Sequence, residues 1–160
     1  MVRDATVADH PVVLAMNNAA EPHVNALPQH EFGWIVARAA YFRVFEDASG
    51  VAGFLLGLPS GTDYWSANYQ WFTQRYERFL YVDRVVVAER ARGRGVGRAL
   101  YEDLHAFAAR DWPRITSEVN LRPPNAPSVA FHEAMGWAAV GVREYDDGAR
   151  AVTMFERTLR

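Results

Sequence analysis

A loop of alternating arginine and glycine residues is the stretch of this chain whose residue types best suit a phosphate ligand. It reads Arg92-Gly93-Arg94-Gly95-Val96-Gly97 and is followed by Arg98. Glycine lets the backbone approach a ligand closely. The first turn of a helix also offers N–H groups without intrahelical partners and a partial positive charge. Together these features predict an anion site, most naturally for a phosphate group.

The elements that must position this loop are a strand before it and a helix after it. Residues 81–87 form a run of β-branched and aromatic residues, which is typical of a buried strand. Val96, Leu100, Leu104 and Phe107 then recur at helical spacing. The glycine order matches neither a Walker A loop nor the G-x-G-x-x-G dinucleotide motif.

Two alternative interpretations of the loop remain beside the phosphate site. One is a plain strand-to-helix turn, with glycines for tight packing and arginines for solubility. The other is a nucleic-acid patch, but the formal net charge is -2 and the sequence pI is ≈ 6.2. A broad phosphate-backbone footprint needs a basic domain, so we expect a small phosphate-bearing ligand and no nucleic acid.

A second motif lies at 125–137 and reads NAPSVAFHEAMGW. It matches a signature of Asn, a small residue at +3, an aromatic or aliphatic residue at +6 and Gly-aromatic at +11 and +12. The first loop matches Arg/Gln-x-x-Gly-x-Gly/Ala through Arg92, Gly95 and Gly97. Together the two motifs resemble the GNAT superfamily of acyl-CoA-dependent N-acetyltransferases. The resemblance departs at +7, where His132 replaces the usual tyrosine.

The resemblance implies direct transfer of an acetyl group from acetyl-CoA, the co-substrate, to a primary amine of a small molecule or peptide. In the family the glycine loop holds the pyrophosphate of coenzyme A, and the preceding strand hydrogen-bonds the pantetheine arm. The cofactor-binding residues expected here are Val85, Val86, Val87, Arg92, Gly93, Arg94, Gly95, Val96, Gly97, Arg98 and Asn125. No metal is expected. The alternative function is a non-catalytic acyl-CoA-binding sensor or interaction module on the same fold.

Acetyl transfer requires a base, because an amine with a pKa of about 8 to 10 is protonated at neutral pH. Glu118 is the first candidate, since a carboxylate within a buried strand is costly unless it is solvated, paired or used. Some GNAT enzymes that acetylate protein N-termini place a glutamate at a similar position. Asp83 is the second candidate, with an ion pair to a nearby arginine as its structural alternative. A chain of water molecules without a single base is the third option.

His132 is the candidate acid that protonates the departing thiolate. An imidazole with a pKa of about 6.5 donates a proton more readily than a phenol. The alternative interpretation of His132 is a solvent-facing residue on a helix.

Candidates for the acceptor site come from two segments. Two adjacent asparagines near the end of the first predicted helix need hydrogen-bond partners, because asparagine is unfavourable within a helix. The long connection at 59–67 is expected to overhang the acceptor. An aromatic wall suits an aromatic amine, an amino-acid derivative or a cationic amine, and the sequence does not choose among them. The expected acceptor-site residues are Asn17, Asn18, His23, Tyr64 and Trp65.

Length and element order predict a single N-acetyltransferase domain over residues 1–160, of the α/β class. A chain of 160 residues with 50% hydrophobic and 22% charged residues can bury a core. The resemblance implies a central mixed, mostly antiparallel sheet flanked by helices. Strands are predicted at 2–6, 41–46, 51–58, 78–88, 115–121, 137–145 and 149–159, and helices at 9–21, 28–40, 68–75, 96–112 and 126–135.

The chain contains no cysteine, which excludes disulfides, thiol catalysis and a cysteine-ligated metal. The N-terminal segment lacks the apolar core of a signal peptide, and no stretch approaches the roughly 20 apolar residues of a membrane span. We therefore expect a cytoplasmic enzyme without a membrane partner. The sequence leaves open whether the chain forms a homodimer.

Overall fold

The computed structural model describes all 160 residues, which form two compact units. The first unit comprises Met1–Pro59 and Val82–Ala106, and the second comprises Ser60–Tyr81 and Phe107–Arg160. The seven strands are β1 (Val2–Asp4), β2 (Tyr41–Asp47), β3 (Gly50–Pro59), β4 (Leu80–Val87), β5 (Arg114–Arg122), β6 (Ala138–Tyr145) and β7 (Arg150–Thr158). Hydrogen bonding orders them β1-β2-β3-β4-β5-β7-β6. The β4–β5 pair is parallel, whereas β1–β2, β2–β3, β5–β7 and β6–β7 are antiparallel. The predicted mixed, mostly antiparallel sheet with flanking helices is therefore confirmed.

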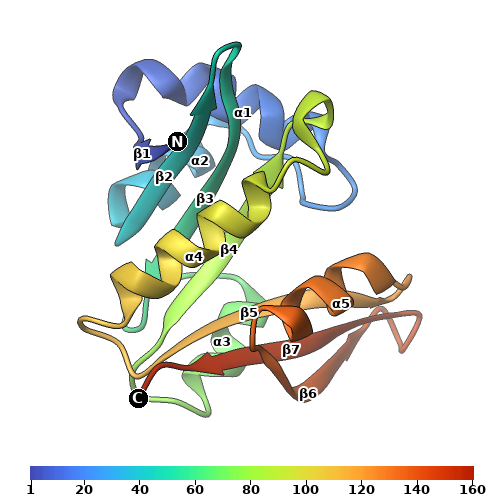
Figure 1. Ribbon diagram of the computed structural model, residues 1–160. Helices are drawn as coiled ribbons and strands as arrows, with labels where there is room; N and C mark the ends of the chain where they lie inside the picture. The colour runs from blue at the N-terminus through green and yellow to red at the C-terminus, as the bar shows by residue number, and fades with distance from the viewer. The chain divides into compact units, whose positions relative to one another are not determined.

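The elements follow the predicted order, with ends that differ by a few residues (Figure 1). The largest difference is at the helix after the glycine loop, which ends at Ala108 and continues as turns over residues 109–111. The helices are α1 (His10–Ala19), α2 (Gln29–Arg38), α3 (Ala67–Thr73), α4 (Val96–Ala108) and α5 (Ala126–Ala134), with 3-10 turns η1 (Val7–Asp9) and η2 (Glu89–Ala91).

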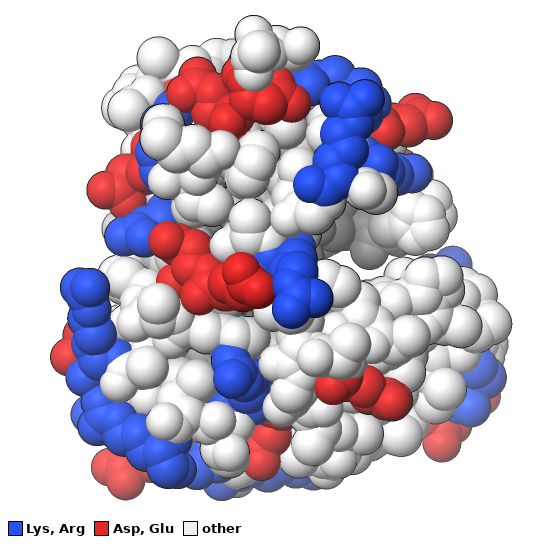
Figure 2. Space-filling model, in the orientation of Figure 1, with Lys and Arg blue, Asp and Glu red and all other residues white.

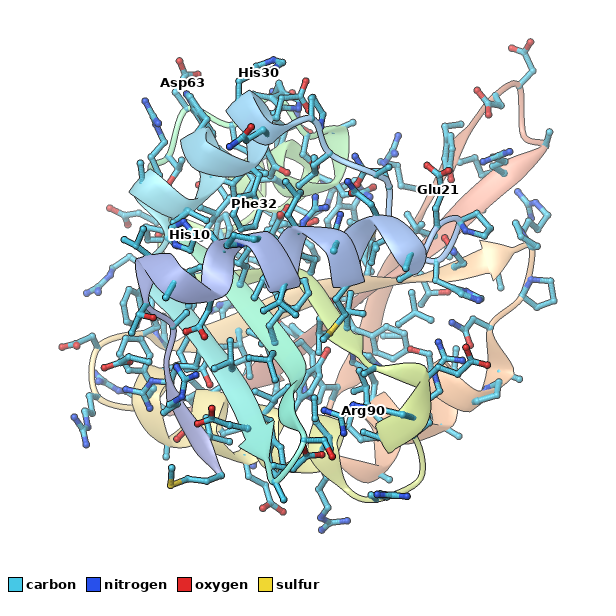
Figure 3. All side chains as sticks on the ribbon, turned by 90° about the horizontal axis from the view of Figure 1, so that it is seen from above. His10, Glu21, His30, Phe32, Asp63 and Arg90 are labelled. Carbon is cyan, nitrogen blue, oxygen red and sulfur yellow. The ribbon has the colours of Figure 1, made fainter.

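The first unit is built around β3, against which α1 and α2 pack. Most of β3 is fully buried, as its continuous apolar sequence predicts. An aromatic contact joins the two helices, because the rings of His10 and Phe32 meet edge to face at 5.6 Å between centroids (Figure 3). The His10 ring also stacks on Phe42 of β2 at 5.7 Å.

The start of α1 is fixed by the predicted capping box. The Asp9 carboxylate accepts hydrogen bonds from the Thr6 backbone N–H at 2.7 Å and from the Thr6 hydroxyl at 3.1 Å. The Arg3 guanidinium beside Asp9 holds the pKa of that carboxyl well below its usual range. The box caps the η1 turn, and the regular helix begins one residue later at His10.

Helix α4 approaches the sheet of the first unit closely because β3 carries a glycine beneath it. A Cβ atom on Gly53 would lie 2.9 Å from Val96 Cγ1 and 3.0 Å from the Val86 carbonyl oxygen. Farther along α4, the Asp103 carboxylate accepts hydrogen bonds from Tyr41 Oη and Arg43 Nη1 on β2, each at 2.7 Å. Burial and this carboxylate raise the pKa of Tyr41 well above its ordinary value.

The second unit contains β5, which pairs in parallel with the start of β4 and antiparallel with β7. The β6–β7 hairpin closes through Asp146, Asp147 and Gly148, all with positive φ, as the Asp-Asp-Gly sequence predicts. On β6, a Cβ atom on Gly141 would lie 2.5 Å from the Trp71 ring of α3. Glycine at this place therefore lets the indole rest directly on the strand.

The core of the second unit is largely aromatic, as the composition of 63–81 predicts. The rings of Tyr64, Phe79 and Tyr81 each lie 5.4 to 5.5 Å from that of Tyr69. Phe72 lies 6.0 Å from Tyr81. No helix of the chain combines the length and the hydropathy that a membrane crossing would need.

Candidate active site

The glycine loop has the backbone geometry that a phosphate site requires. Gly93 and Gly95 have φ of 76° and 80°, in the left-handed region that side chains other than glycine rarely adopt. The first backbone hydrogen bond of α4 runs from the Ala99 N–H to the Gly95 carbonyl at 3.0 Å. The N–H groups of residues 96–98 therefore have no intrahelical acceptor and carry the positive end of the helix dipole.

The arginines around this loop divide into two groups. Arg90 on η2 pairs with Asp47 at 2.7 Å and donates to the Val51 carbonyl at 3.2 Å, so it ties the loop to the β2–β3 hairpin (Figure 3). Arg92 and Arg94 are exposed and form no ion pair with the chain. Figure 2 shows basic side chains gathered on the surface where Figure 1 draws the β4–α4 connection.

Arg98, the last arginine of the loop region, forms an ion pair at the surface. Arg98 pairs with Glu102 one helical turn later at 2.9 Å, and both side chains are more than half exposed. Because exposed pairs contribute little energy, this contact leaves Arg98 able to exchange partners.

The end of β4 leads into the loop through the η2 turn. Its Ala88 neighbour donates a backbone N–H to the Ala52 carbonyl at 2.8 Å, and Val86 is buried at 7% exposure. Val85 and Val87 are partly exposed, since alternate residues of a strand face opposite sides. The predicted role of this strand end toward a pantetheine arm stays a prediction.

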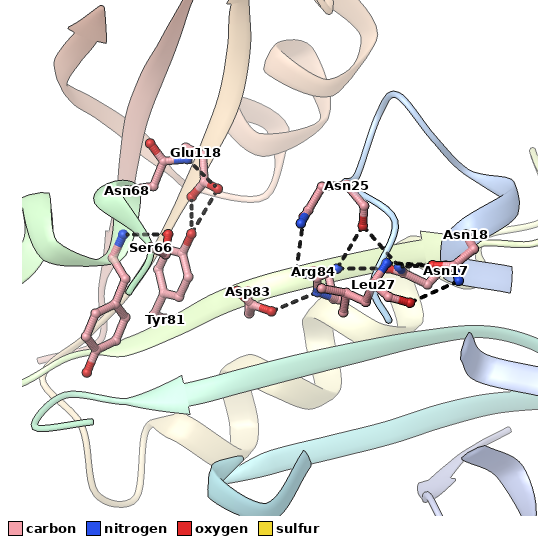
Figure 4. Close-up of polar contacts among 11 residues, drawn as sticks. Asn17, Asn18, Asn25, Leu27, Ser66, Asn68, Tyr81, Asp83, Arg84 and Glu118 are labelled. Atoms are coloured by element: carbon pink, nitrogen blue, oxygen red, sulfur yellow. Dashed lines mark hydrogen bonds and ion pairs between the residues drawn. The ribbon is translucent and has the colours of Figure 1, made fainter. Parts of the chain in front are cut away.

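Asp83, the second candidate base, is held in a buried ion pair. Its carboxylate lies 2.7 Å from Arg84 Nε, and each side chain is 3% exposed. Arg84 Nη1 also donates to Asn17 Oδ1 at 3.1 Å and to the Asn25 carbonyl at 3.2 Å (Figure 4). Asp83 therefore forms the ion pair with a nearby arginine that was its alternative interpretation.

The two asparagines of α1 have the partners that their place in a helix requires. Asn17 is fully buried, and its amide donates to the Asn25 carbonyl at 3.2 Å. Asn18 receives the Leu27 N–H at 2.9 Å and donates to the Leu27 carbonyl at 3.2 Å. The expectation that Asn17 lines an acceptor surface is corrected here, because it fixes the α1–α2 connection from inside. His23 lies on that connection and is exposed.

Glu118, the first candidate base, projects from the middle of β5, and its carboxylate accepts hydrogen bonds from Tyr81 and Asn68. Tyr81 Oη lies 2.9 Å from Oε1 and 2.7 Å from Oε2, and Asn68 Nδ2 donates to Oε1 at 3.1 Å (Figure 4). Tyr81 is 1% exposed, whereas Glu118 is partly exposed. The carboxylate is therefore paired and yet reaches the surface of its unit.

His132 is a buried core residue of the second unit, with 4% exposure. Its Nδ1 lies 2.7 Å from the Ser128 carbonyl oxygen, which can only accept, so Nδ1 carries the proton. The ring packs against Trp137 at 5.3 Å and Phe155 at 5.6 Å. Burial lowers the pKa of His132 below its ordinary value. The solvent-facing alternative is wrong, and an acid role requires a proton at Nε2.

Asn125 caps helix α5, and its Oδ1 accepts the Ser128 N–H at 3.3 Å. Pro127 lies in the first turn and Gly136 follows the helix with φ of 87°, both as predicted. A local capping role accounts for this asparagine without a ligand, so its contact with the cofactor stays a prediction.

The two aromatic acceptor candidates differ in exposure. Tyr64 is 5% exposed and packs in the aromatic core, whereas Trp65 is 53% exposed. The ring of Trp65 meets that of Tyr64 edge to face at 5.0 Å. Of the pair, Trp65 alone presents a broad ring surface to solvent.

Sequence reasoning missed Tyr81 and Asn68 as functional residues. Tyr81 reads as one more aromatic residue in a buried strand, and Asn68 as a surface position of a short helix. No spacing rule links them to Glu118, which lies 37 and 50 residues away. A polar tip on a residue assigned to the core was the one signal, since buried tyrosine hydroxyls find hydrogen-bond partners.

Comparisons with known proteins identify the class. A sequence model described as the acetyltransferase (GNAT) family matches residues 11–137. No curated protein matches the chain significantly. Among solved structures, the ribosomal-protein-S18-alanine N-acetyltransferase from Escherichia coli is 16% identical, with a TM-score of 0.77 over 99% of this chain and 93% of that chain.

Two further structures share the fold. The ribosomal-protein-alanine N-acetyltransferase from Brucella melitensis is 22% identical, with a TM-score of 0.74 over 99% of both chains. A putative phosphinothricin N-acetyltransferase is 20% identical, with a TM-score of 0.74 over 100% of this chain and 98% of that chain.

The family match, together with the shared fold, identifies an N-acetyltransferase. Since the family match spans most of its length, the chain belongs to the GNAT acetyltransferase family, whose members use acetyl-CoA as co-substrate. The resemblance seen in the two sequence motifs is thereby confirmed.

Proposed function

We propose that this protein transfers the acetyl group of acetyl-CoA to a primary amine of a small molecule or peptide, with Glu118 as the base. The observation that carries the proposal is the glycine loop, with two left-handed glycines before the N-terminus of α4 and two exposed arginines beside it. Backbone N–H groups and these cations suit the pyrophosphate of coenzyme A.

The reaction needs no covalent enzyme intermediate. The neutral amine attacks the thioester carbonyl carbon, a C–N bond forms, and the C–S bond breaks as the tetrahedral intermediate collapses. The proton leaves the amine nitrogen for Glu118, and the coenzyme A thiolate takes a proton from an acid, for which His132 or a water molecule is proposed. A backbone N–H of β4 would stabilise the oxyanion.

Glu118 is preferred to Asp83 because of their surroundings. The Asp83 carboxylate is buried against Arg84, and protonating it would leave a buried guanidinium without its counter-ion. Glu118 is partly exposed and accepts hydrogen bonds from the neutral side chains of Asn68 and Tyr81, so solvent can compensate for its change of charge when it takes a proton.

The acceptor stays open between two classes. Two structural neighbours are named for ribosomal-protein alanine, and one for phosphinothricin. Because all three are below 25% identity, they support a peptide amine and a small-molecule amine alike. Trp65 is the proposed contact with the acceptor, and Asn18, His23 and Tyr64 are weaker candidates. A cytoplasmic location is retained as part of the proposal.

The deciding experiment joins two measurements. Isothermal titration with acetyl-CoA tests binding, and release of coenzyme A thiol from acetyl-CoA, detected with DTNB, tests transfer across a library of peptide and small-molecule amines. The protein suits this assay, because it has no cysteine to react with DTNB and no lysine side chain to acetylate.

Binding together with amine-dependent thiol release is the expected result. Absence of binding at high micromolar acetyl-CoA would overturn the proposal. Binding without thiol release from any amine would instead favour the acyl-CoA sensor.

A further inference from the structure

A polar chain extends from Glu118 to the edge strand of the second unit and is not used in the mechanism above. Asn68 on α3 donates from Nδ2 to Glu118 Oε1 at 3.1 Å. Its other amide atom, Oδ1, accepts from Arg143 Nε on β6 at 2.7 Å. Three elements distant in sequence, β5, α3 and β6, therefore meet through one asparagine side chain.

The hydrogen bonds from Arg143 through Asn68 to Glu118 can run in only one donor-to-acceptor direction. A guanidinium can only donate, so Arg143 obliges Asn68 to turn its carbonyl oxygen toward β6. The amide nitrogen then faces Glu118 and can only donate to it. If the Asn68 amide were flipped, both hydrogen bonds would be lost. Its NH₂ group would then face the Arg143 donor, and its oxygen would face the Glu118 carboxylate.

Local contacts fix Asn68 on α3 and Arg143 on β6. Asn68 lies in the first turn of α3, which Ser66 caps by accepting the Tyr69 N–H at 3.3 Å. Trp71 of the same helix rests against Gly141 of β6, two residues from Arg143. The Arg143 guanidinium also lies 4.9 Å from the centre of the Tyr145 ring.

We propose that Asn68 and Arg143 are positioning residues, which orient the Glu118 carboxylate so that it can accept a proton from the acceptor amine. The Tyr81 hydroxyl has one proton and lies within hydrogen-bond distance of both carboxylate oxygens, so it does not distinguish one oxygen from the other. The Asn68 amide donates to Oε1 and so fixes which oxygen faces α3.

This inference rests on the proposed function, because it presumes that Glu118 is the base. It differs from a purely structural role in what it predicts. A structural contact would affect folding and leave the reaction of the folded enzyme unchanged. A positioning contact affects kcat and its pH dependence, with less effect on KM.

The first pair of variants is Asn68→Asp and its control Gln70→Glu. Both add a carboxylate to α3, but Gln70 donates to the Tyr64 carbonyl and does not contact Glu118. Asn68→Asp keeps the bond to Arg143 and opposes Glu118 with a second carboxylate. We expect about a 10- to 100-fold loss of kcat at pH 7 and an acidic limb of the pH–rate profile moved upward by about one unit. Gln70→Glu should leave both unchanged.

The second pair is Arg143→Gln and its control Arg150→Gln. Both arginines lie in the β6–β7 hairpin, and Arg150 pairs at the surface with Asp146. A glutamine at 143 can present either amide atom to Asn68, so the orientation is lost while the fold is kept. We expect about a fivefold loss of kcat in Arg143→Gln and no change in Arg150→Gln. Asn68→Gln, which retains an amide, should recover part of the rate that Asn68→Ala loses.

A readout without activity separates this inference from the proposed function. In a ¹⁵N–¹H spectrum, the Asn68 side-chain amide signals should move in both Glu118→Gln and Arg143→Gln, and stay in place in Arg150→Gln. If no amine supports thiol release, the proposed function fails. The spectrum then still shows whether Asn68 forms hydrogen bonds with Glu118 and Arg143.

Two results would overturn the inference. One is an Asn68 amide signal that is indifferent to Glu118→Gln and Arg143→Gln. The other is an active enzyme in which Asn68→Asp and Arg143→Gln match their controls in kcat and pH profile.

Discussion

The candidate site in one unit of this acetyltransferase is built from backbone groups, whereas the candidate site in the other unit is built from side chains. In the first unit, the candidate phosphate site is made of consecutive backbone groups, with Gly93 and Gly95 turned to positive φ ahead of α4. In the second unit, Glu118 is surrounded by side chains from separate elements, among them Tyr81 and Asn68.

The difference teaches what each site tolerates. A backbone site depends on dihedral angles, so it is insensitive to most side chains but intolerant of a Cβ atom at a left-handed position. A side-chain site depends on atoms at the ends of flexible chains, so the identity of each partner matters. Four substitutions test this comparison, in order of decreasing expected effect.

Glu118→Gln should cause the largest change. It removes the proposed base but keeps the size of the side chain, so kcat should fall about 100- to 1000-fold at pH 7. The loss should be smaller at pH 9, because more of the amine is already neutral. Steady-state thiol release measures the rate, and titration should give an unchanged affinity for coenzyme A. Glu144→Gln, at an exposed surface pair, is the control. A variant with the wild-type rate would return Glu118 to a structural role.

Asp83→Asn should act on stability and spare the rate. It leaves the buried Arg84 without its counter-ion, which should cost about 3 kcal/mol of unfolding free energy. Denaturant unfolding measures this cost, and kcat per folded molecule should stay near that of the wild type. Native stability together with a large loss of kcat would instead make Asp83 the base and reverse the assignment of the two carboxylates.

Gly95→Ala should weaken coenzyme A binding about tenfold, because alanine disfavours φ of 80° by about 1 to 2 kcal/mol and the loop backbone shifts. The matched control is Gly61→Ala, since Gly61 has φ of 87° and equally open surroundings in the second unit. Both variants should lose similar stability by thermal unfolding, but only the first should lose affinity by titration. Equal affinities would contradict the backbone-built phosphate site.

His132→Phe should have the smallest kinetic effect, a loss of about three- to tenfold in kcat with coenzyme A affinity unchanged. The low cost follows because a thiolate is a good leaving group and water can supply its proton. An unchanged kcat would remove His132 from the mechanism.

The same variant makes a prediction for stability against pH. Burial holds the pKa of His132 below 6.5 in the folded protein, so the unfolded chain binds more protons in the interval beneath that value. Wild-type stability should be full above pH 6.5 and fall as the pH drops below it. Urea unfolding at pH 7.5 and 5.5 should show a smaller difference for His132→Phe than for the wild type.

Much of the fold could be predicted from local signals. The turn at Asp146, Asp147 and Gly148, the capping box at Thr6 and Asp9, and the stop at Gly136 all act within a few residues, so they can be read along the chain. The predicted end of α4, at the residue before Pro113, lies several residues beyond the observed end at Ala108, because a proline sets only the latest position at which a helix can end.

The site was predictable to the extent that its parts are contiguous. The Arg-Gly loop and its flanking strand and helix occupy one stretch, so residue order alone predicts a phosphate-binding loop and, with the second motif, the acetyltransferase family, of which the family is confirmed. The tertiary structure decided which polar residues are partners. It buried Asn17 and Asp83 around Arg84, placed His132 in an aromatic core, and brought Tyr81 and Asn68 to Glu118. These pairings depend on strand register and helix packing across tens of residues, and no local spacing encodes them.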